Sequence, residues 1–271
     1  MNIRVNSIRK MFPWLPVFLG VVFCAASLGA FAAMVGNLPD FTVRTFRAGD
    51  APFDIQVGDF DNNGNLDFAV ASRDSGRILL FLLAKDRQGH LGVNQRSYET
   101  GRAPVSLFTA DLDGDGHQDL VTANLGEKSF AVLMNKGKAA KTGFPDLAPL
   151  KRYPLSDSPH GVWGADFDRD GDIDLAVAVE KFEGGAIHNQ VMIFENTGKG
   201  EFKLKSQHRV GTEGRVIVGA DLDGDGAIDL ITTNKGSRTV SLLFNDGKGS
   251  FPLVTSVEAG DSPQGVWAGD L

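Results

Sequence analysis

The sequence has a single cysteine, Cys24, so no disulfide can form within the chain. After residue 33 it also lacks any sustained apolar period of 3.6 residues, so we expect few helices. Basic residues are in the minority, with 27 Lys and Arg against 34 Asp and Glu, a net charge of −7. These shortages argue against a disulfide-stabilised fold, a helical bundle and a broad, non-specific binder of nucleic acids.

Recognisable catalytic motifs are missing as well. The sequence contains no H-E-x-x-H, no G-x-S-x-G and no phosphate-binding glycine loop. Of the five histidines, His160 takes the same repeat position as Gln264, which fits a residue at the start of a strand better than a catalytic base. We therefore predict that the protein is not an enzyme and has no catalytic residues.

The first 33 residues have the pattern of an export signal. Arg4, Arg9 and Lys10 precede an uncharged stretch from residue 12 to residue 33, which ends in the small-residue pattern of Ala30 and Ala32. We predict that residues 1–33 are a signal peptide, and that the protein is periplasmic, exposed on the cell surface or extracellular. An uncleaved membrane anchor is the alternative, because 22 uncharged residues could span a bilayer. After cleavage no membrane insertion is expected.

An internal repeat organises the rest of the chain, residues 34–271. An Asp-rich motif occurs at residues 59–67, 111–119, 166–174 and 221–229, and Asp270 begins a fifth copy. Short apolar runs with many β-branched residues flank each motif, and glycine-rich turns separate them. Each unit therefore reads as four short strands. Such a sheet cannot bury both faces alone, so we predict an all-β propeller of stacked four-stranded blades.

The repeated motif has the chemistry of a calcium loop. Position 6 is always Gly, which allows a sharp bend, and oxygen-bearing side chains at positions 1, 3, 5 and 9 suit Ca²⁺. Position 7 would contribute only its backbone carbonyl. An EF-hand is excluded, because position 12 is Val or Thr inside a strand-like run instead of Glu before a helix. The predicted ligands of about four Ca²⁺ ions are Asp59, Asp61, Asn63, Asn65, Asp67, Asp111, Asp113, Asp115, His117, Asp119, Asp166, Asp168, Asp170, Asp172, Asp174, Asp221, Asp223, Asp225, Ala227 and Asp229.

These units resemble FG-GAP repeats of the integrin-α type, and in particular the bacterial FG-GAP-like or VCBS repeats. The resemblance is carried by the Asp-rich loops, by the turns at residues 49–52 and 101–104, and by the Asn-Asp-Gly-Lys-Gly-Ser-Phe segment at 245–251. It implies a β-propeller, often seven-bladed, with Ca²⁺ in the loop between the first two strands of a blade. The chain is shorter than seven blades require. We expect a partial or truncated ring, with an outer strand at residues 41–47, four full repeats, and an inner strand at 264–268.

The resemblance and the composition together favour an exported, non-enzymatic binding or adhesion module for protein or glycan partners. A carbohydrate-active domain of the polysaccharide-lyase kind and a structural scaffold of a longer exported protein are the alternatives. The insertions at residues 136–149 and 180–189 break the repeat and are candidate partner contacts. Recurrence of Trp163 and Trp267 favours packing between blades over sugar stacking. Unpaired blade edges predict self-association.

Overall fold

The computed structural model describes residues 44–86, 88–138, 143–147, 150–184 and 186–269. The predicted signal peptide, residues 1–33, lies outside this range. The chain divides into two compact units, Met1–Phe46 and Arg47–Leu271, and only residues 44–46 of the first are described. The following account concerns the second unit. In the described residues, no helix is long and apolar enough to cross a membrane.

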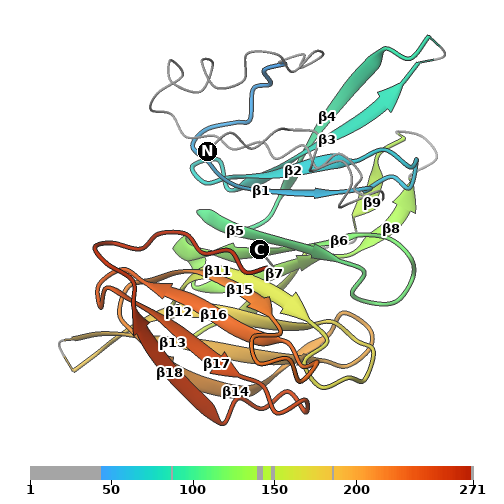
Figure 1. Ribbon diagram of the computed structural model, residues 1–271. Helices are drawn as coiled ribbons and strands as arrows, with labels where there is room; N and C mark the ends of the chain where they lie inside the picture. The colour runs from blue at the N-terminus through green and yellow to red at the C-terminus, as the bar shows by residue number, and fades with distance from the viewer. Residues whose placement is uncertain (1–43, 87, 139–142, 148–149, 185, 270–271) are drawn as a thin grey trace, which may run out of the picture. The chain divides into compact units, whose positions relative to one another are not determined.

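Four sheets of four antiparallel strands make up this unit, as predicted (Figure 1). The first sheet consists of β1 (Pro52–Gly58), β2 (Asp67–Ser72), β3 (Arg77–Lys85) and β4 (Leu91–Glu99). The second consists of β5 (Pro104–Ala110), β6 (Asp119–Asn124), β7 (Ser129–Leu133) and β10 (Lys151–Pro154). The third consists of β11 (Ser158–Ala165), β12 (Asp174–Glu183), β13 (Ala186–Asn196) and β14 (Phe202–Val210). The fourth consists of β15 (Gly214–Ala220), β16 (Asp229–Asn234), β17 (Thr239–Phe244) and β18 (Leu253–Glu258).

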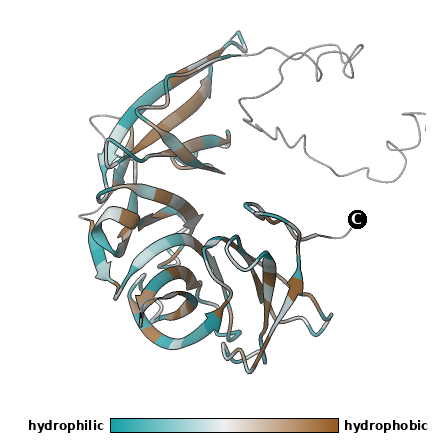
Figure 2. Cartoon of the chain, turned by 90° about the vertical axis from the view of Figure 1, so that its left-hand side faces the viewer, coloured by the Kyte–Doolittle hydropathy of each residue, from teal (hydrophilic) through white to brown (hydrophobic). Residues whose placement is uncertain are grey.

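The sheets stack through their apolar middle strands, which Figure 2 shows as hydrophobic bands. Three buried clusters join consecutive sheets, and each contains alternate residues from the second and third strands of the neighbouring blades. Alternation matters because side chains on a strand point to opposite faces, so a continuously apolar strand serves two interfaces. Val121 and Val132, for example, face the third sheet, whereas Leu120 and Leu133 face the first.

The first strands of neighbouring blades contact one another through an aromatic residue on one strand and a glycine on the next. Phe108 of β5 packs on Gly164 of β11, and Trp163 of β11 packs on Gly219 of β15. A Cβ added to Gly219 would lie 2.1 Å from the Trp163 ring, so the position has no room for a side chain. The prediction that the repeated tryptophan packs between blades is confirmed for Trp163. It is not observed for Trp267, which is 73% exposed.

Two expected strands are absent from the described residues, whereas the two expected insertions are present. The expected inner strand at 264–268 is not formed, and the expected outer strand at 41–47 is not formed in its described part, residues 44–47. A strand exists only where another strand offers hydrogen bonds, and neither segment pairs within the described residues. The insertion at 136–149 contributes the hairpin of β8 (Asn135–Lys138) and β9 (Pro145–Leu147). The insertion at 180–189 lengthens the β12–β13 hairpin.

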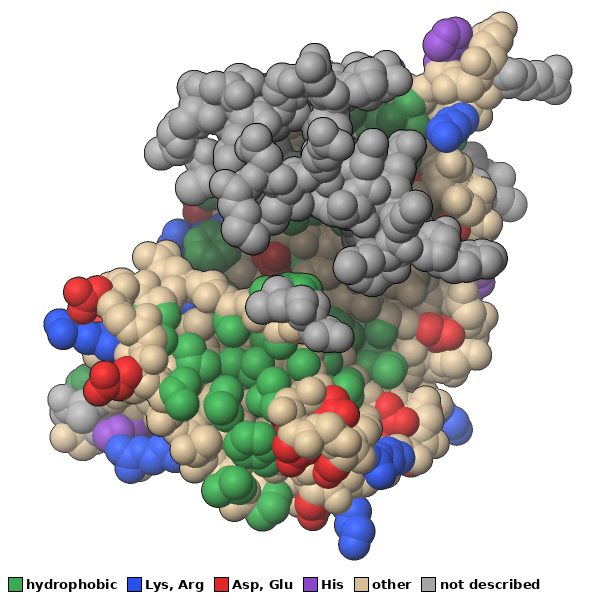
Figure 3. Space-filling view, viewed as in Figure 1, with side chains coloured by type: hydrophobic (Ala, Val, Ile, Leu, Met, Phe, Trp, Pro, Cys, Tyr) green, Lys and Arg blue, Asp and Glu red, His purple; other side chains and the backbone are tan. Residues whose placement is uncertain are grey.

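The outward face of the fourth sheet, defined by Leu222, Val240, Leu242, Leu253 and Val257, is apolar and partly exposed. Figure 3 shows hydrophobic side chains gathered over this sheet. Leu222, Leu253 and Val257 are 36%, 56% and 50% exposed, whereas residues at the position of Leu222 in the other repeats are buried by the following blade. Within the described residues the four blades do not close into a ring. The expectation of a partial propeller is confirmed.

Candidate metal centres

Each Asp-rich motif forms the loop between the first and second strands of its sheet. In the third loop, both oxygens of Asp166 at position 1 accept backbone hydrogen bonds, from the Asp170 N–H at 3.1 Å and the Gly171 N–H at 3.0 Å. Position 6 has a positive φ in all four loops, +98° at Gly171, which a residue with a Cβ adopts only at a cost. The glycine thus lets the loop fold around its first aspartate.

Three carboxylates meet in each loop. In loops two to four these are positions 1, 3 and 5, and in the first loop, where position 5 is Asn63, they are positions 1, 3 and 9. In each group one oxygen per residue lies within 4.8 Å of the others. The groups are Asp59, Asp61 and Asp67; Asp111, Asp113 and Asp115; Asp166, Asp168 and Asp170; and Asp221, Asp223 and Asp225.

Two position-3 oxygens in these clusters have been removed from water without receiving a hydrogen bond. The Oδ1 atoms of Asp113 and Asp168 are buried and have no donor. Burial of an ionised oxygen without a partner is costly, and buried charges are normally paired or bound to a metal. A hard cation prefers such oxygen ligands, so the donor set fits Ca²⁺.

The aspartate at position 9 also fixes its loop to the sheet, a role that the spacing of the motif does not predict. The four aspartates there are nearly fully buried, and each joins its loop to the strands of the sheet. Asp119 Oδ2 accepts from the Leu112 N–H at 2.8 Å, and its Oδ1 accepts from the Asn135 N–H at 2.7 Å. Burial, together with the neighbouring loop carboxylates, raises the pKa of Asp119 to about 6 and that of Asp174 to about 7.

At position 7, the side chains of His117 and Asp172 lie outside the carboxylate clusters of their loops. The N–H at this position donates to the position-5 side chain, at 3.0 Å from His117 to Asp115 and at 2.6 Å from Ala227 to Asp225. The ring of His117 instead contacts the amide of Asn62 in the first loop, with 2.9 Å between Nδ1 and Nδ2. It therefore bridges two loops.

In the second, third and fourth blades, an asparagine at the end of the third strand connects the loop to that of the preceding blade, and sequence reasoning missed this role. Asn196 is 2% exposed, and its Nδ2 donates to the Leu112 carbonyl of the preceding loop at 2.8 Å. Asn135 and Asn245 donate in the same way to the carbonyls of Phe60 and Phe167. The available signal is an Asn-x-Gly pattern that recurs at residues 135–137, 196–198 and 245–247, which by itself indicates only a turn. The first blade has Leu83 at this position.

Lysine side chains enter two of the clusters. The Lys136 ammonium donates to Asp113 Oδ2 and lies 3.8 Å from Asp115 Oδ2. The Lys205 ammonium donates to Asp168 Oδ2 at 2.7 Å. The hydrogen bond to Asp113 raises the pKa of Lys136. Burial lowers the pKa of Lys205, but the neighbouring carboxylates outweigh burial and raise it overall. Both lysines are therefore cationic at neutral pH.

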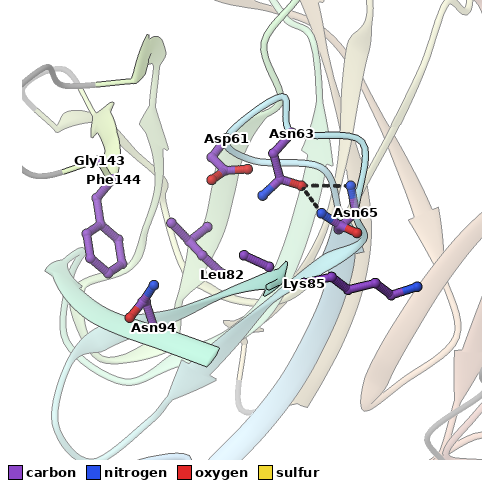
Figure 4. A pocket seen from close by; sticks show the side chains of 9 residues that line it. Asp61, Asn63, Asn65, Leu82, Lys85, Asn94, Gly143 and Phe144 are labelled. Atoms are coloured by element: carbon purple, nitrogen blue, oxygen red, sulfur yellow. Dashed lines mark hydrogen bonds between the residues drawn. The ribbon is translucent and has the colours of Figure 1, made fainter. Parts of the chain in front are cut away.

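A groove of about 540 Å³ lies beside the first loop (Figure 4). Asp61, Asn63 and Asn65 of the loop line one part of it, and Asn94 of β4 lines another. Phe144, next to β9, comes from the insertion in the second blade. Two features that break the repeat, the asparagine-rich first loop and the inserted hairpin, thus meet around one hollow.

Comparison with known proteins agrees with this geometry. The profile of the FG-GAP-like repeat matches residues 59–122, 111–177, 166–232 and 221–271, so four consecutive matches cover most of the chain. No curated protein matches the sequence. Each of the first three matches begins at an Asp-rich loop, covers the last three strands of that sheet and the first strand of the next, and ends in the second strand of the next sheet. The chain belongs to the family of FG-GAP-like repeat proteins.

Proposed function

We propose that this protein is an exported, calcium-binding module that binds a partner without catalysing a reaction. The observation that supports this proposal most is a carboxylate cluster in the same loop of each repeat. In two of these clusters a buried aspartate oxygen has no hydrogen-bond donor. A divalent cation would pair these oxygens and offset the repulsion within each loop. The Asp residues at positions 1, 3 and 5 would hold it, with Asp67 replacing position 5 in the first loop.

Calcium here would have a structural role. Its ligands lie between the first two strands of each blade. In the second blade, for example, Asp119 at position 9 accepts from the Asn135 backbone after the third strand, and the Asn135 side chain connects the same loop to that of the preceding blade. Binding would stabilise the loops and the contacts between blades. No reaction step is assigned to the metal.

Export is supported by the signal-like first 33 residues and by the family, because FG-GAP repeats are typical of extracellular or surface proteins. The groove beside the first loop supports partner binding, since amide groups and an aromatic ring are suited to hydrogen bonding and stacking against a sugar or a peptide. Defined oligosaccharides, acidic and neutral, would be titrated against the chain and against Asn94→Ala. Binding that this substitution leaves unchanged would contradict a role for the groove.

Asp168→Asn tests the metal sites, and Asp172→Asn is its matched control. Both replace an aspartate of the third loop, but only Asp168 belongs to the cluster. Calorimetric titration with CaCl₂ should find one site fewer in the Asp168 variant and an unchanged number in the Asp172 variant. Equal numbers of sites in the wild type and the Asp168 variant would contradict the ligand assignment.

A further inference from the structure

The two lysines in the carboxylate clusters come from different places in the repeat. Lys136 directly follows the buried Asn135, whereas Lys205 lies in the fourth strand of its blade, β14. Both nevertheless deliver an ammonium to the position-3 carboxylate of their loop, Asp113 or Asp168. Because the two lysines occupy non-equivalent positions in the repeat, the repeat pattern does not explain why both contact the position-3 carboxylate.

The fourth loop provides the contrast. At the position of Lys136 the fourth blade has Asp246, and at the position of Lys205 it has Val254. Within the described residues, no Lys or Arg forms an ion pair with Asp221, Asp223 or Asp225, and these three are exposed. Arg169 approaches the fourth loop, but it donates to the backbone carbonyl of Asp225, at 3.1 Å.

We propose that Lys136 and Lys205 are tethered counter-ions that neutralise the second and third loops when calcium is absent, and that calcium must displace. This inference rests on the proposed calcium binding. The lysines occupy Oδ2 of Asp113 and Asp168, which are atoms of predicted calcium ligands. Calcium therefore exchanges with an ammonium in these two loops, whereas the fourth loop has no such competitor among the described residues.

Two consequences distinguish this arrangement from four equal sites. Without calcium, the second and third loops keep their folded geometry better than the fourth, because an ammonium offsets their carboxylate repulsion. When calcium is added, the fourth loop gains more stability than the other two. Partly exposed ion pairs are weak, so removal of one lysine should change the calcium affinity of its own loop by about two- to fivefold.

The test uses Lys205→Gln and Lys136→Gln in the full chain, with Lys235→Gln as control. Lys235 also forms an ion pair, 3.7 Å from Glu213, but outside the loops. Each loop variant should melt at a lower temperature than the wild type in chelator, and should bind calcium about two- to fivefold more tightly at one site by calorimetry. Lys205→Arg, which keeps the charge, should behave like the wild type in both measurements.

Damage to the fold in general would lower the melting temperature in chelator and in saturating calcium alike, and would contradict the counter-ion role. Unchanged or weaker calcium binding in Lys205→Gln, with a wild type that binds calcium, would overturn the exchange and leave the proposed function standing. A wild type that binds no calcium would overturn the proposed function, and the exchange with it.

Discussion

Replacement of Asn196 by alanine is predicted to lower the free energy of unfolding more than replacement of any exposed residue nearby. The Asn196 side chain makes four hydrogen bonds: Nδ2 donates to the carbonyls of Leu112 (2.8 Å) and Ile173 (3.1 Å), and Oδ1 accepts from the N–H groups of Gly198 and Gly200 (both 3.1 Å). At about 0.5–1.5 kcal/mol net for each bond, and with some relaxation, the loss should be about 2–4 kcal/mol.

The assay is denaturant unfolding followed by tryptophan fluorescence and circular dichroism, in chelator and again in excess calcium. Thr197→Ala is the control, because Thr197 is the exposed neighbour of Asn196, and it should change the free energy of unfolding by less than about 0.5 kcal/mol. A loss below about 1 kcal/mol in Asn196→Ala would refute the claim that this side chain joins the second and third blades.

Asn196→Asp refines the same test. The substitution keeps the shape but places a carboxylate oxygen opposite two carbonyls and close to Asp174. Such an aspartate would have a raised pKa in the folded state, so its cost should grow as the pH rises above about 4 and shrink on acidification. A pH-independent defect would contradict the assigned orientation of the amide.

Three other predictions follow. Gly219→Ala should cost about 1–3 kcal/mol in urea unfolding, because its Cβ would meet the Trp163 ring; a neutral effect would contradict that contact. In chelator, the free energy of unfolding should fall as the pH rises from about 4 to about 7, because the buried Asp174 has a pKa of about 7 in the folded chain and 3.8 in the unfolded chain. Calcium should reduce this fall. A free energy of unfolding that rises with pH over this range would contradict the prediction. Leu253→Lys with Val257→Lys should weaken self-association in light scattering, because both residues lie on the exposed apolar face of the fourth sheet; association that persists would place the contact elsewhere.

The blades and their loops could be predicted because they depend on local spacing. The short apolar runs, the position-6 glycine and the recurring aspartates are each fixed within about ten residues, and the four copies reinforce one another. The carboxylate clusters at positions 1, 3 and 5 follow directly, since a nine-residue loop with a sharp bend brings these side chains together.

Contacts between blades could not be predicted from local spacing. Asn196 and Leu112 are 84 residues apart, and the donor in one repeat meets an acceptor in another only after the sheets have stacked. The bond from Lys205 to Asp168 lies within one blade, but it joins residues 37 positions apart, which local spacing does not predict either. The inner strand expected at 264–268 was wrong for a related reason, because an apolar pattern forms a strand only when a partner strand is present.

Thermal unfolding in chelator and in excess CaCl₂ tests the central claim most directly. The chain belongs to the FG-GAP-like repeat family, and its carboxylate clusters predict about four calcium sites with dissociation constants in the range of about 10⁻⁴–10⁻³ M. At a free calcium concentration tenfold above the dissociation constant, each site should add about 1.4 kcal/mol to the free energy of unfolding. The melting temperature should therefore rise by several degrees with calcium and not with an equal concentration of potassium. A melting temperature that is the same in chelator and in calcium would contradict the account.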